Sequence, residues 1–142
     1  MKVLITSPPL RTEKGVAMVT QNRQFQWYKI PSCLFPLIPA SAATLLKSKG
    51  FDVVWKDAII EGMSAADYRA FLQSARPDLV VLEGKTPVIK RMWKIIAEIK
   101  DILPAAKVVI MGDHVTAFPE ETLQHSPADF VLTGGDYDFM LL

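Results

Sequence analysis

Five short apolar runs recur along the chain, and each is rich in valine, leucine or isoleucine. Runs of this length and composition are typical of strands that are buried on both faces of a sheet. Glycine, proline or a polar residue follows each of them, which is typical of turns. The predicted strands are Lys2–Thr6, Asp52–Lys56, Leu79–Glu83, Val108–Met111 and Phe130–Thr133.

Helical periodicity occupies three of the intervals between these runs. Ser64 and Asp67 have the spacing of a capping box, and Gly50 is a typical residue just after a helix end. Strands that alternate with helices predict right-handed βαβ units, and therefore a parallel sheet. We expect an α/β fold of the flavodoxin-like, doubly wound kind, with five parallel strands in the order 2-1-3-4-5. The predicted helices are Ala40–Lys49, Ser64–Ala75 and Val88–Ile102.

Two segments do not fit this simple alternation. Residues 7–39 form a connection much longer than is usual after a first strand. Because it contains Phe25, Trp27 and Tyr28, we interpret it as a segment that covers a ligand or docks on another domain. Residues 136–142 resemble the start of a fifth helix that is cut short. We therefore interpret residues 1–142 as one domain, the N-terminal part of a longer protein.

Composition narrows the function classes. A net charge of +1 does not predict the basic face that holds nucleic acid. Prolines interrupt the most apolar segment, residues 30–46, so it is too short for a membrane span. The single cysteine, Cys33, excludes a disulfide framework and any multi-cysteine metal or iron–sulfur site made by this chain alone. A reducing cytoplasm is the expected compartment.

Glycines and polar residues gather where the predicted strands end. Ligands of open parallel sheets bind at this carboxyl edge. Glycine lets a ligand approach the backbone closely, and threonine hydroxyls form short hydrogen bonds. Glycine is also the ordinary turn residue, so the site is favoured by the set of strand ends rather than by any one of them. The relevant segments are Thr6–Pro9, Glu83–Thr86, Gly112–His114 and Thr133–Asp136.

His114 is the most chemically versatile of these residues. It could act as a metal ligand, an acid or base, or a hydrogen-bond donor to a ligand. Its spacing from Asp113, Glu120, Glu121 and His125 matches no metal-ligand pattern, and Glu120 with Glu121 suits the start of a helix. The dinucleotide, Walker and nucleophile-elbow motifs are all missing. We therefore expect neither a metal site nor catalytic side chains in this chain.

Taken together, these segments resemble the N-terminal cobalamin-binding domains of B12-dependent radical S-adenosylmethionine (SAM) enzymes. Residues 1–9 are similar to the family's opening strand and its Asn-Pro-Pro end, with Ser7 in place of asparagine. Residues 36–50 are similar to its first helix. The most specific piece is residues 112–121, Gly-Asp-His-Val-Thr-Ala-Phe-Pro-Glu-Glu, which resembles the family's Gly-Gly-x-His-x-Thr…Pro-Glu-Glu element.

The resemblance implies a module that places cobalamin over the carboxyl ends of the strands, with its base off the cobalt. The partner would be a radical SAM domain further along the parent protein, which would bind SAM and a 4Fe-4S cluster. This chain itself would bind neither. The parent would catalyse methyl transfer or related radical chemistry, and the oligomeric state stays open. The residues implied to bind the cofactor are Pro8, Pro9, Thr86, Gly112, Asp113, His114, Thr116, Gly134 and Gly135.

The sequence departs from the family pattern at several points. Met111 replaces the first glycine of a Gly-Gly step, where it would crowd the nucleotide tail, and Gly135 disturbs the closing Gly-Glu-Gly-Glu segment. The histidine motif that supplies a lower cobalt ligand in other cobalamin proteins is missing. Two alternatives therefore stay open. One is a degenerate domain that binds no cobalamin and serves for docking, and the other is a stand-alone enzyme that uses His114 and Asp113.

Overall fold

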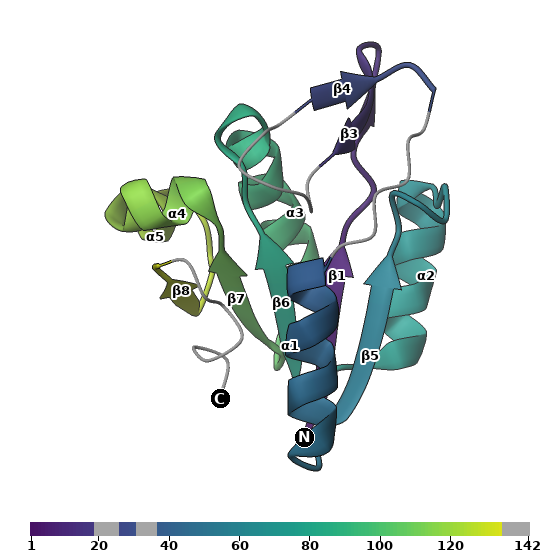
Figure 1. The fold of residues 1–142 in the computed structure, drawn as a ribbon, viewed down its shortest axis with the longest axis vertical. Helices are drawn as coiled ribbons and strands as arrows, with labels where there is room; N and C mark the ends of the chain where they lie inside the picture. The colour runs from purple at the N-terminus through teal and green to yellow at the C-terminus, as the bar shows by residue number, and fades with distance from the viewer. Residues whose placement is uncertain (19–25, 31–36, 135–142) are drawn as a thin grey trace.

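The computed structural model of the chain describes residues 1–18, 26–30 and 37–134, and a five-stranded sheet lies at its centre (Figure 1). Neighbouring strands are parallel throughout, in the order β5-β1-β6-β7-β8. Counted along the chain, this is the order 2-1-3-4-5, so the predicted topology is confirmed. The strands are β1 (Lys2–Ser7), β5 (Asp52–Asp57), β6 (Leu79–Glu83), β7 (Lys107–Met111) and β8 (Phe130–Leu132).

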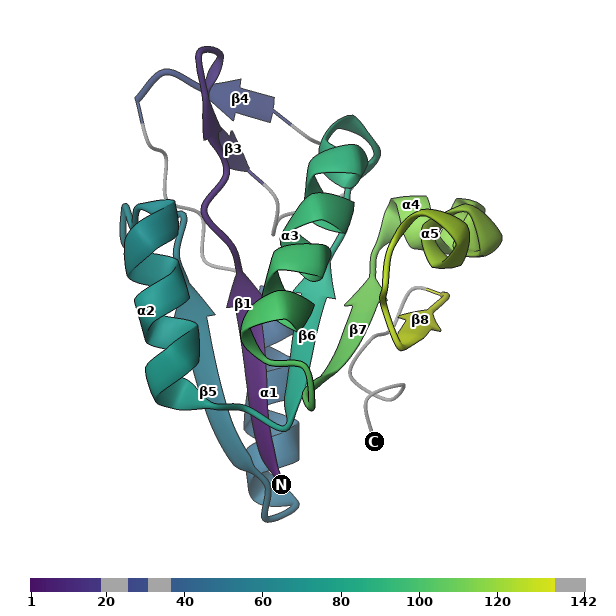
Figure 2. The same ribbon diagram turned by 180° about the vertical axis from the view of Figure 1, so that it is seen from behind.

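Helices cover both faces of this sheet (Figures 1 and 2). Helix α1 (Leu37–Ser48) lies on one face, and α2 (Ala65–Ala75) with α3 (Ile89–Ile102) lies on the other. A 3₁₀ helix, η1 (Thr86–Val88), leads into α3. Two short helices, α4 (Asp113–Ala117) and α5 (Pro119–His125), connect β7 to β8. The arrangement is the doubly wound one that the sequence predicts.

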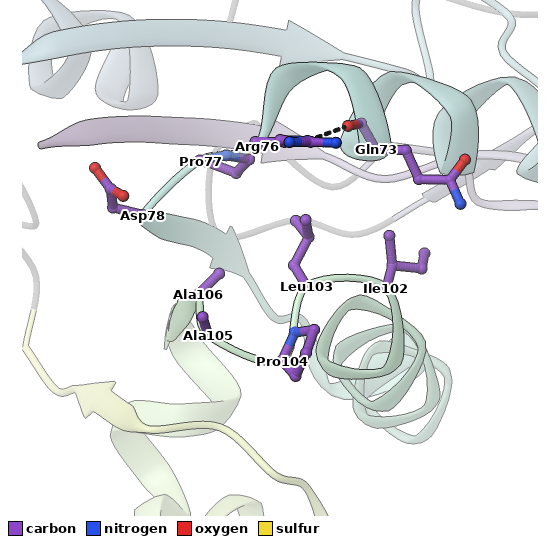
Figure 3. A pocket seen from close by; sticks show the side chains of 9 residues that line it. All are labelled: Gln73, Arg76, Pro77, Asp78, Ile102, Leu103, Pro104, Ala105 and Ala106. Atoms are coloured by element: carbon purple, nitrogen blue, oxygen red, sulfur yellow. Dashed lines mark hydrogen bonds between the residues drawn. The ribbon is translucent and has the colours of Figure 1, made fainter.

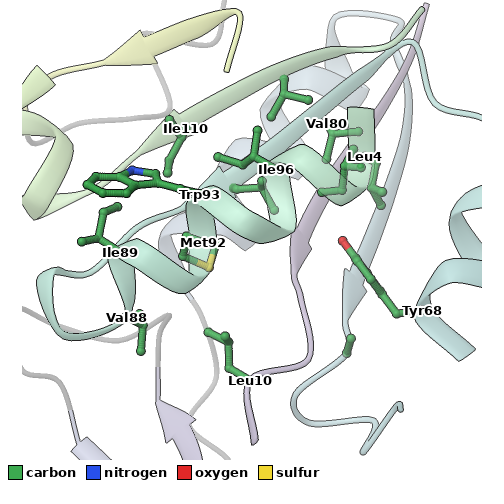
Figure 4. Packing of buried hydrophobic residues seen from close by; sticks show 14 of the residues in the cluster. Leu4, Leu10, Tyr68, Val80, Val88, Ile89, Met92, Trp93, Ile96 and Ile110 are labelled. Carbon is green, nitrogen blue, oxygen red and sulfur yellow. The ribbon is translucent and has the colours of Figure 1, made fainter. Parts of the chain in front are cut away.

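The apolar side chains form two clusters, one on each face of the sheet. The larger lies against α2 and α3, where Leu4, Val80 and Ile96 are fully buried (Figure 4). The smaller lies beneath α1 and includes Val3 and Val81. Neighbouring residues of one strand thus face opposite clusters, as the two-residue period of a strand requires. Burying one such side chain contributes about 1.5–3 kcal/mol to stability.

Local signals explain where the helices begin and end. The Ser64 hydroxyl accepts the Asp67 N–H, and the Asp67 carboxylate accepts the Ser64 N–H, both at 3.1 Å. The predicted capping box is therefore confirmed, and its hydrogen bonds lower the pKa of Asp67. Helix α1 begins at Leu37, earlier than the sequence indicated, because Pro39 is tolerated in a first turn.

A second, small sheet lies beyond the carboxyl ends of the central strands (Figures 1 and 2). It is antiparallel and consists of β2 (Arg11–Thr12), β3 (Gly15–Met18) and β4 (Gln26–Tyr28). The sequence predicted only a long connection here. Gly15 has φ +114°, and a Cβ at this position would collide with the Tyr28 carbonyl. Phe25, Cys33 and Gly135, with the predicted C-terminal helix, lie outside the described residues.

No helix among the described residues is long and apolar enough to span a lipid bilayer.

The Asp129 carboxylate holds the segment between α5 and β8 against β7. Asp129 accepts hydrogen bonds from Lys100 Nζ and Lys107 Nζ, both at 2.9 Å, and from the Val108 N–H at 2.8 Å. Partial burial alone would raise the pKa of Asp129. The hydrogen bonds from the two lysines and from the Val108 N–H outweigh this effect and lower the pKa to about 2. The ionised carboxylate therefore stabilises the junction between β7 and β8.

We expect the variant Asp129→Asn to lower the free energy of unfolding at pH 7 by about 1–3 kcal/mol, since it removes charged hydrogen bonds. Because the folded-state pKa lies below its ordinary value of 3.8, this contribution is present above that value and is lost as the pH falls toward about 2. Urea unfolding at pH 7 and at low pH measures both effects. Asp101→Asn, at an exposed position on α3, is the matched control. Equal losses in the two variants would contradict the prediction.

Candidate functional site

The loops that follow β6 and β7 touch at the carboxyl edge of the sheet. The Gly84 N–H donates to the Met111 carbonyl at 2.7 Å, and Gly112 has φ +117° and ψ 178°, a conformation that is essentially restricted to glycine. A Cβ at Gly112 would lie 2.5 Å from the Gly84 carbonyl oxygen. Glycine at 112 is therefore required by both backbone conformation and close approach.

A charged cluster joins the same two loops. Lys85 Nζ lies 2.8 Å from Oε1 of Glu83, the last residue of β6, and 3.2 Å from Oδ2 of Asp113, the first residue of α4 after β7. Lys85 is only 6% exposed, so its ammonium group depends on these carboxylates for solvation. Burial raises the pKa of Glu83, although the charge of Lys85 opposes the rise. Burial also opposes the charge on Lys85, but the two carboxylates outweigh it and raise the pKa of the ammonium group.

His114 lies beneath this edge and is 4% exposed. Its Nδ1 is 3.2 Å from Thr86 Oγ1, and its Nε2 is 3.3 Å from Glu121 Oε2. The second contact is within ion-pair distance but is not aligned as a hydrogen bond. The ring packs edge-on against Trp93, with centroids 6.1 Å apart, and lies 5.4 Å from Phe118. His114 thus connects the loop after β6 to α4 and α5.

A cavity of about 560 Å³ opens above His114 and Thr86. The N-terminal end of α3 and Glu121 form part of its wall, and the small sheet contributes Thr12 and Trp27. The cavity is within the range of about 300–1,000 Å³ that is typical of small-molecule sites. The small sheet therefore adds an aromatic and a hydroxyl side chain to the edge at which the sequence predicts ligand binding.

Thr116 links the ends of β7 and β8. Its hydroxyl donates to the Gly112 carbonyl at 3.0 Å and accepts the Gly134 N–H at 3.1 Å. Three predicted residues that follow two different strands therefore meet at one point. Thr116 and Gly134 are exposed, so their remaining polar atoms are accessible from the edge.

The other predicted residues are distributed around this junction. Asp113 is held by Lys85, while Pro8 is buried and Pro9 faces a separate groove between α2 and α3. Met111 is 2% exposed and packs in the cluster beneath α1, on the opposite face of the sheet from Val88 and Ile89 of the cavity wall. The structure thus unites Thr86 with His114, and Gly112 with Thr116 and Gly134.

Sequence reasoning did not assign roles to four polar residues at this edge. Glu121 was considered only as a metal ligand and was then interpreted as an acid at a helix start, and Thr12 belongs to a strand too short to recognise. Glu83 and Lys85 belong to the predicted strand end Glu83–Thr86. Their opposite charges on either side of Gly84 were the signal in the sequence that could have identified this ion pair. Among the described residues, no three histidine, cysteine, aspartate or glutamate side chains are grouped as they would be to hold a metal ion.

A second cavity, of about 600 Å³, lies at the opposite, amino-terminal edge of the sheet (Figure 3). Arg76 points along its rim and donates from Nε to the Gln73 carbonyl at 3.3 Å. Leu103, Pro104 and Ala105 form much of the rest. None of the residues predicted to bind a ligand lies here, so this cavity serves as a comparison site.

The contact between Gly84 and Gly112 makes a direct prediction. We expect Gly112→Ala to lower the free energy of unfolding by on the order of 2–4 kcal/mol, because the new Cβ adds a backbone clash to a strained conformation. Gly50→Ala is the control, since Gly50 has φ +87° but open space around its Cβ position. Chemical denaturation measures both variants. A loss at Gly112 no larger than that at Gly50 would show that the clash is relieved without cost.

The charged cluster makes another prediction. Lys85→Met leaves Glu83 buried without its cation, and removing one partner of a buried pair costs about 3–5 kcal/mol. With the pKa of Glu83 raised still further, the loss should be small below its ordinary value of 4.5 and should grow as the pH rises above it. Urea unfolding between pH 4 and pH 8 checks this. The double variant Glu83→Gln, Lys85→Met should recover most of the loss, and a loss independent of pH would contradict the prediction.

Comparisons with known proteins identify similar folds. Two solved structures of the radical S-adenosylmethionine methyltransferase TsrM from Kitasatospora setae match the chain, each with a TM-score of 0.60 and 19% identity. One holds cobalamin and a 4Fe-4S cluster, and the other holds tryptophan substrate and a SAM analogue. Each match covers 87% of this chain but only 22% and 21% of the respective structures, so the chain spans about a fifth of their length. At this identity the likeness shows the fold.

No curated protein matches the chain. The family model for the B12 binding domain matches residues 28–140, which is most of the sequence and includes the loops after β6 and β7. The resemblance to cobalamin-binding domains is therefore confirmed: the chain belongs to the B12-binding domain family.

Proposed function

We propose that this chain binds cobalamin at the carboxyl edge of its sheet, with the cofactor's base off the cobalt. The observation that carries the proposal is the cavity of about 560 Å³ that Thr86, His114 and Trp27 line at this edge. It lies on residues that the B12-binding family model covers, apart from Thr12 and Trp27. The fold places ligands at this edge on general grounds as well.

The chemistry of the edge suits such a cofactor. Cobalamin has a ring bordered by neutral amides and a tail with a phosphate and an aromatic base. The hydroxyl oxygens of Thr12, Thr86 and Thr116 can accept hydrogen bonds from amide N–H groups, and Trp27 offers apolar surface. Part of the cofactor would occupy the cavity, and the rest would extend over the exposed ends of the strands. Met111 does not enter this cavity, because it packs on the other face of the sheet.

When bound, cobalamin supplies a cobalt centre that can carry a methyl group. The residues of this chain would position it rather than react. Thr86, Thr116 and Gly134 would provide hydrogen-bonding groups, Asp113 and His114 would hold the loops that present them, and Gly112 would keep the edge open. Pro8, Pro9 and Gly135 complete the proposed set, with Gly135 outside the described residues.

We further propose that residues 1–142 form the N-terminal module of a longer radical SAM enzyme. The parent would bind SAM and a 4Fe-4S cluster in a downstream domain and would transfer a methyl group. The likeness to TsrM, a radical SAM methyltransferase that is several times longer, supports this arrangement. One cysteine cannot provide the three thiolates of such a cluster, so the cluster ligands must come from elsewhere in the parent.

A degenerate domain that keeps the fold without cobalamin is the alternative. Met111 favours it, since its side chain fills space beneath α1 where the family has a glycine. Such a domain would serve as a docking surface.

Retention of hydroxocobalamin distinguishes these functions. The purified chain is mixed with hydroxocobalamin and desalted, and its visible spectrum is recorded. We expect stoichiometric retention with a base-off spectrum. A folded chain that retains no cobalamin would support the degenerate alternative.

Two bulky substitutions locate the bound cofactor. Thr86→Trp fills the cavity at the carboxyl edge, and Ala105→Trp adds the same side chain to the cavity at the amino edge. Both positions are exposed, so the two variants are matched. We expect Thr86→Trp to weaken cobalamin binding at least about tenfold, by blocking contacts that contribute about 1.4 kcal/mol or more, and Ala105→Trp to leave it unchanged. The opposite result would place the ligand at the wrong edge for this proposal.

A further inference from the structure

The two ring nitrogens of His114 face chemically different partners. Nδ1 lies 3.2 Å from the Thr86 hydroxyl, and Nε2 lies 3.3 Å from the Glu121 carboxylate. The ring is 4% exposed and is held between Trp93 and Phe118, so it is packed in place. Thr86 is exposed and lines the cavity. The buried ring of His114 therefore contacts a hydroxyl group that a ligand in the cavity can reach.

The partners determine which nitrogen carries the proton. An ionised carboxylate can only accept hydrogen bonds, so the neutral ring is most stable with its hydrogen on Nε2, toward Glu121. Nδ1 then carries a lone pair, which accepts a hydrogen bond from the Thr86 O–H, its hydrogen-bond partner among the described residues. A modest rotation of the half-exposed Glu121 side chain would align its contact as a hydrogen bond. The Thr86 hydroxyl therefore donates its hydrogen bond to His114 and not to a ligand.

We propose that Glu121 and His114 together make the Thr86 hydroxyl a hydrogen-bond acceptor toward the cavity. The ligand group recognised there is an N–H donor of a neutral primary amide, and not an anionic oxygen. This inference rests on the proposed function to the extent that the amides around the cobalamin ring are the groups it would select. Glu121 and His114 are positioning residues, since they act through Thr86.

The surroundings of His114 show what protonation would change. Glu121 faces it from α5, and Lys90 of α3 lines the same cavity. Asp113 precedes it but is paired with Lys85, which also contacts Glu83. On α5, His125 is separated from His114 by Trp93, on whose ring it stacks at 5.1 Å. Once protonated, His114 donates to both partners, and the freed Thr86 proton turns toward the cavity as a donor.

The tautomer of His114 can be measured without any ligand. The chain has two histidines, so His125→Asn leaves a single imidazole to observe by long-range ¹H–¹⁵N NMR. We expect the hydrogen on Nε2 in this background. Adding Glu121→Gln should populate the Nδ1–H form, because an amide can donate to Nε2, while the adjacent exposed Glu120→Gln should change nothing. An Nδ1–H ring in the presence of Glu121 would overturn the inference.

Binding of hydroxocobalamin tests the consequence for recognition. At pH 7.5, Thr86→Val should weaken binding about tenfold, whereas Thr86→Ser keeps the hydroxyl and should stay within about twofold of the parent chain. Lowering the pH until the NMR signal shows a protonated His114 should weaken binding in the parent chain, but less in Glu121→Gln. Equal affinity of the valine and serine variants, or equal pH profiles with and without Glu121, would overturn the inference.

The two measurements separate this inference from the proposed function. An Nε2–H ring in a chain that retains no cobalamin would contradict the function and leave the hydrogen-bond arrangement standing. An Nδ1–H ring in a chain that retains cobalamin would support the proposed function and contradict the hydrogen-bond arrangement.

Discussion

The contact between the backbones of Gly84 and Gly112 is the constraint on which the site depends. Any side chain at Gly112 would push the loops after β6 and β7 apart, because its Cβ would lie 2.5 Å from a carbonyl oxygen. Both the ion pair of Lys85 with Asp113 and the hydrogen bond of Thr86 with His114 cross this junction. The charged and neutral parts of the site therefore share one backbone joint, and a change there would disturb both.

Charge at this edge is balanced within the protein. Glu83 and Asp113 surround Lys85, so the buried ammonium group is solvated by carboxylates that sit beside it rather than by a ligand. The cavity lining combines hydroxyls, an imidazole and an indole with the charged side chains of Lys90, Arg91 and Glu121. The proposed preference for an amide N–H is therefore a property of the Thr86 hydroxyl, whose hydrogen-bond direction depends on His114, and not of the cavity as a whole.

Local sequence patterns predicted the framework well, whereas contacts between distant residues lay beyond their reach. The strands and the Ser64–Asp67 capping box are determined by neighbours along the chain, and both are confirmed. The small sheet was missed because strands of two to four residues carry no periodicity. Glu121 was correctly placed in a first helical turn, but its approach to His114 depends on how α5 packs, and no spacing in the sequence expresses this.

The two faces of the sheet separate the Thr86–His114 cavity from Met111, where this chain departs from the family pattern. In β7, Ile110 packs against the α2 and α3 side, and Met111 packs beneath α1. The cavity wall contains Val88 and Ile89, which belong to the same cluster as Ile110. A larger residue at 111 therefore fills the α1 side and leaves the Thr86–His114 cavity intact. The Thr86–His114 cavity and the space beneath α1 can then change independently, since opposite sides of one strand support them.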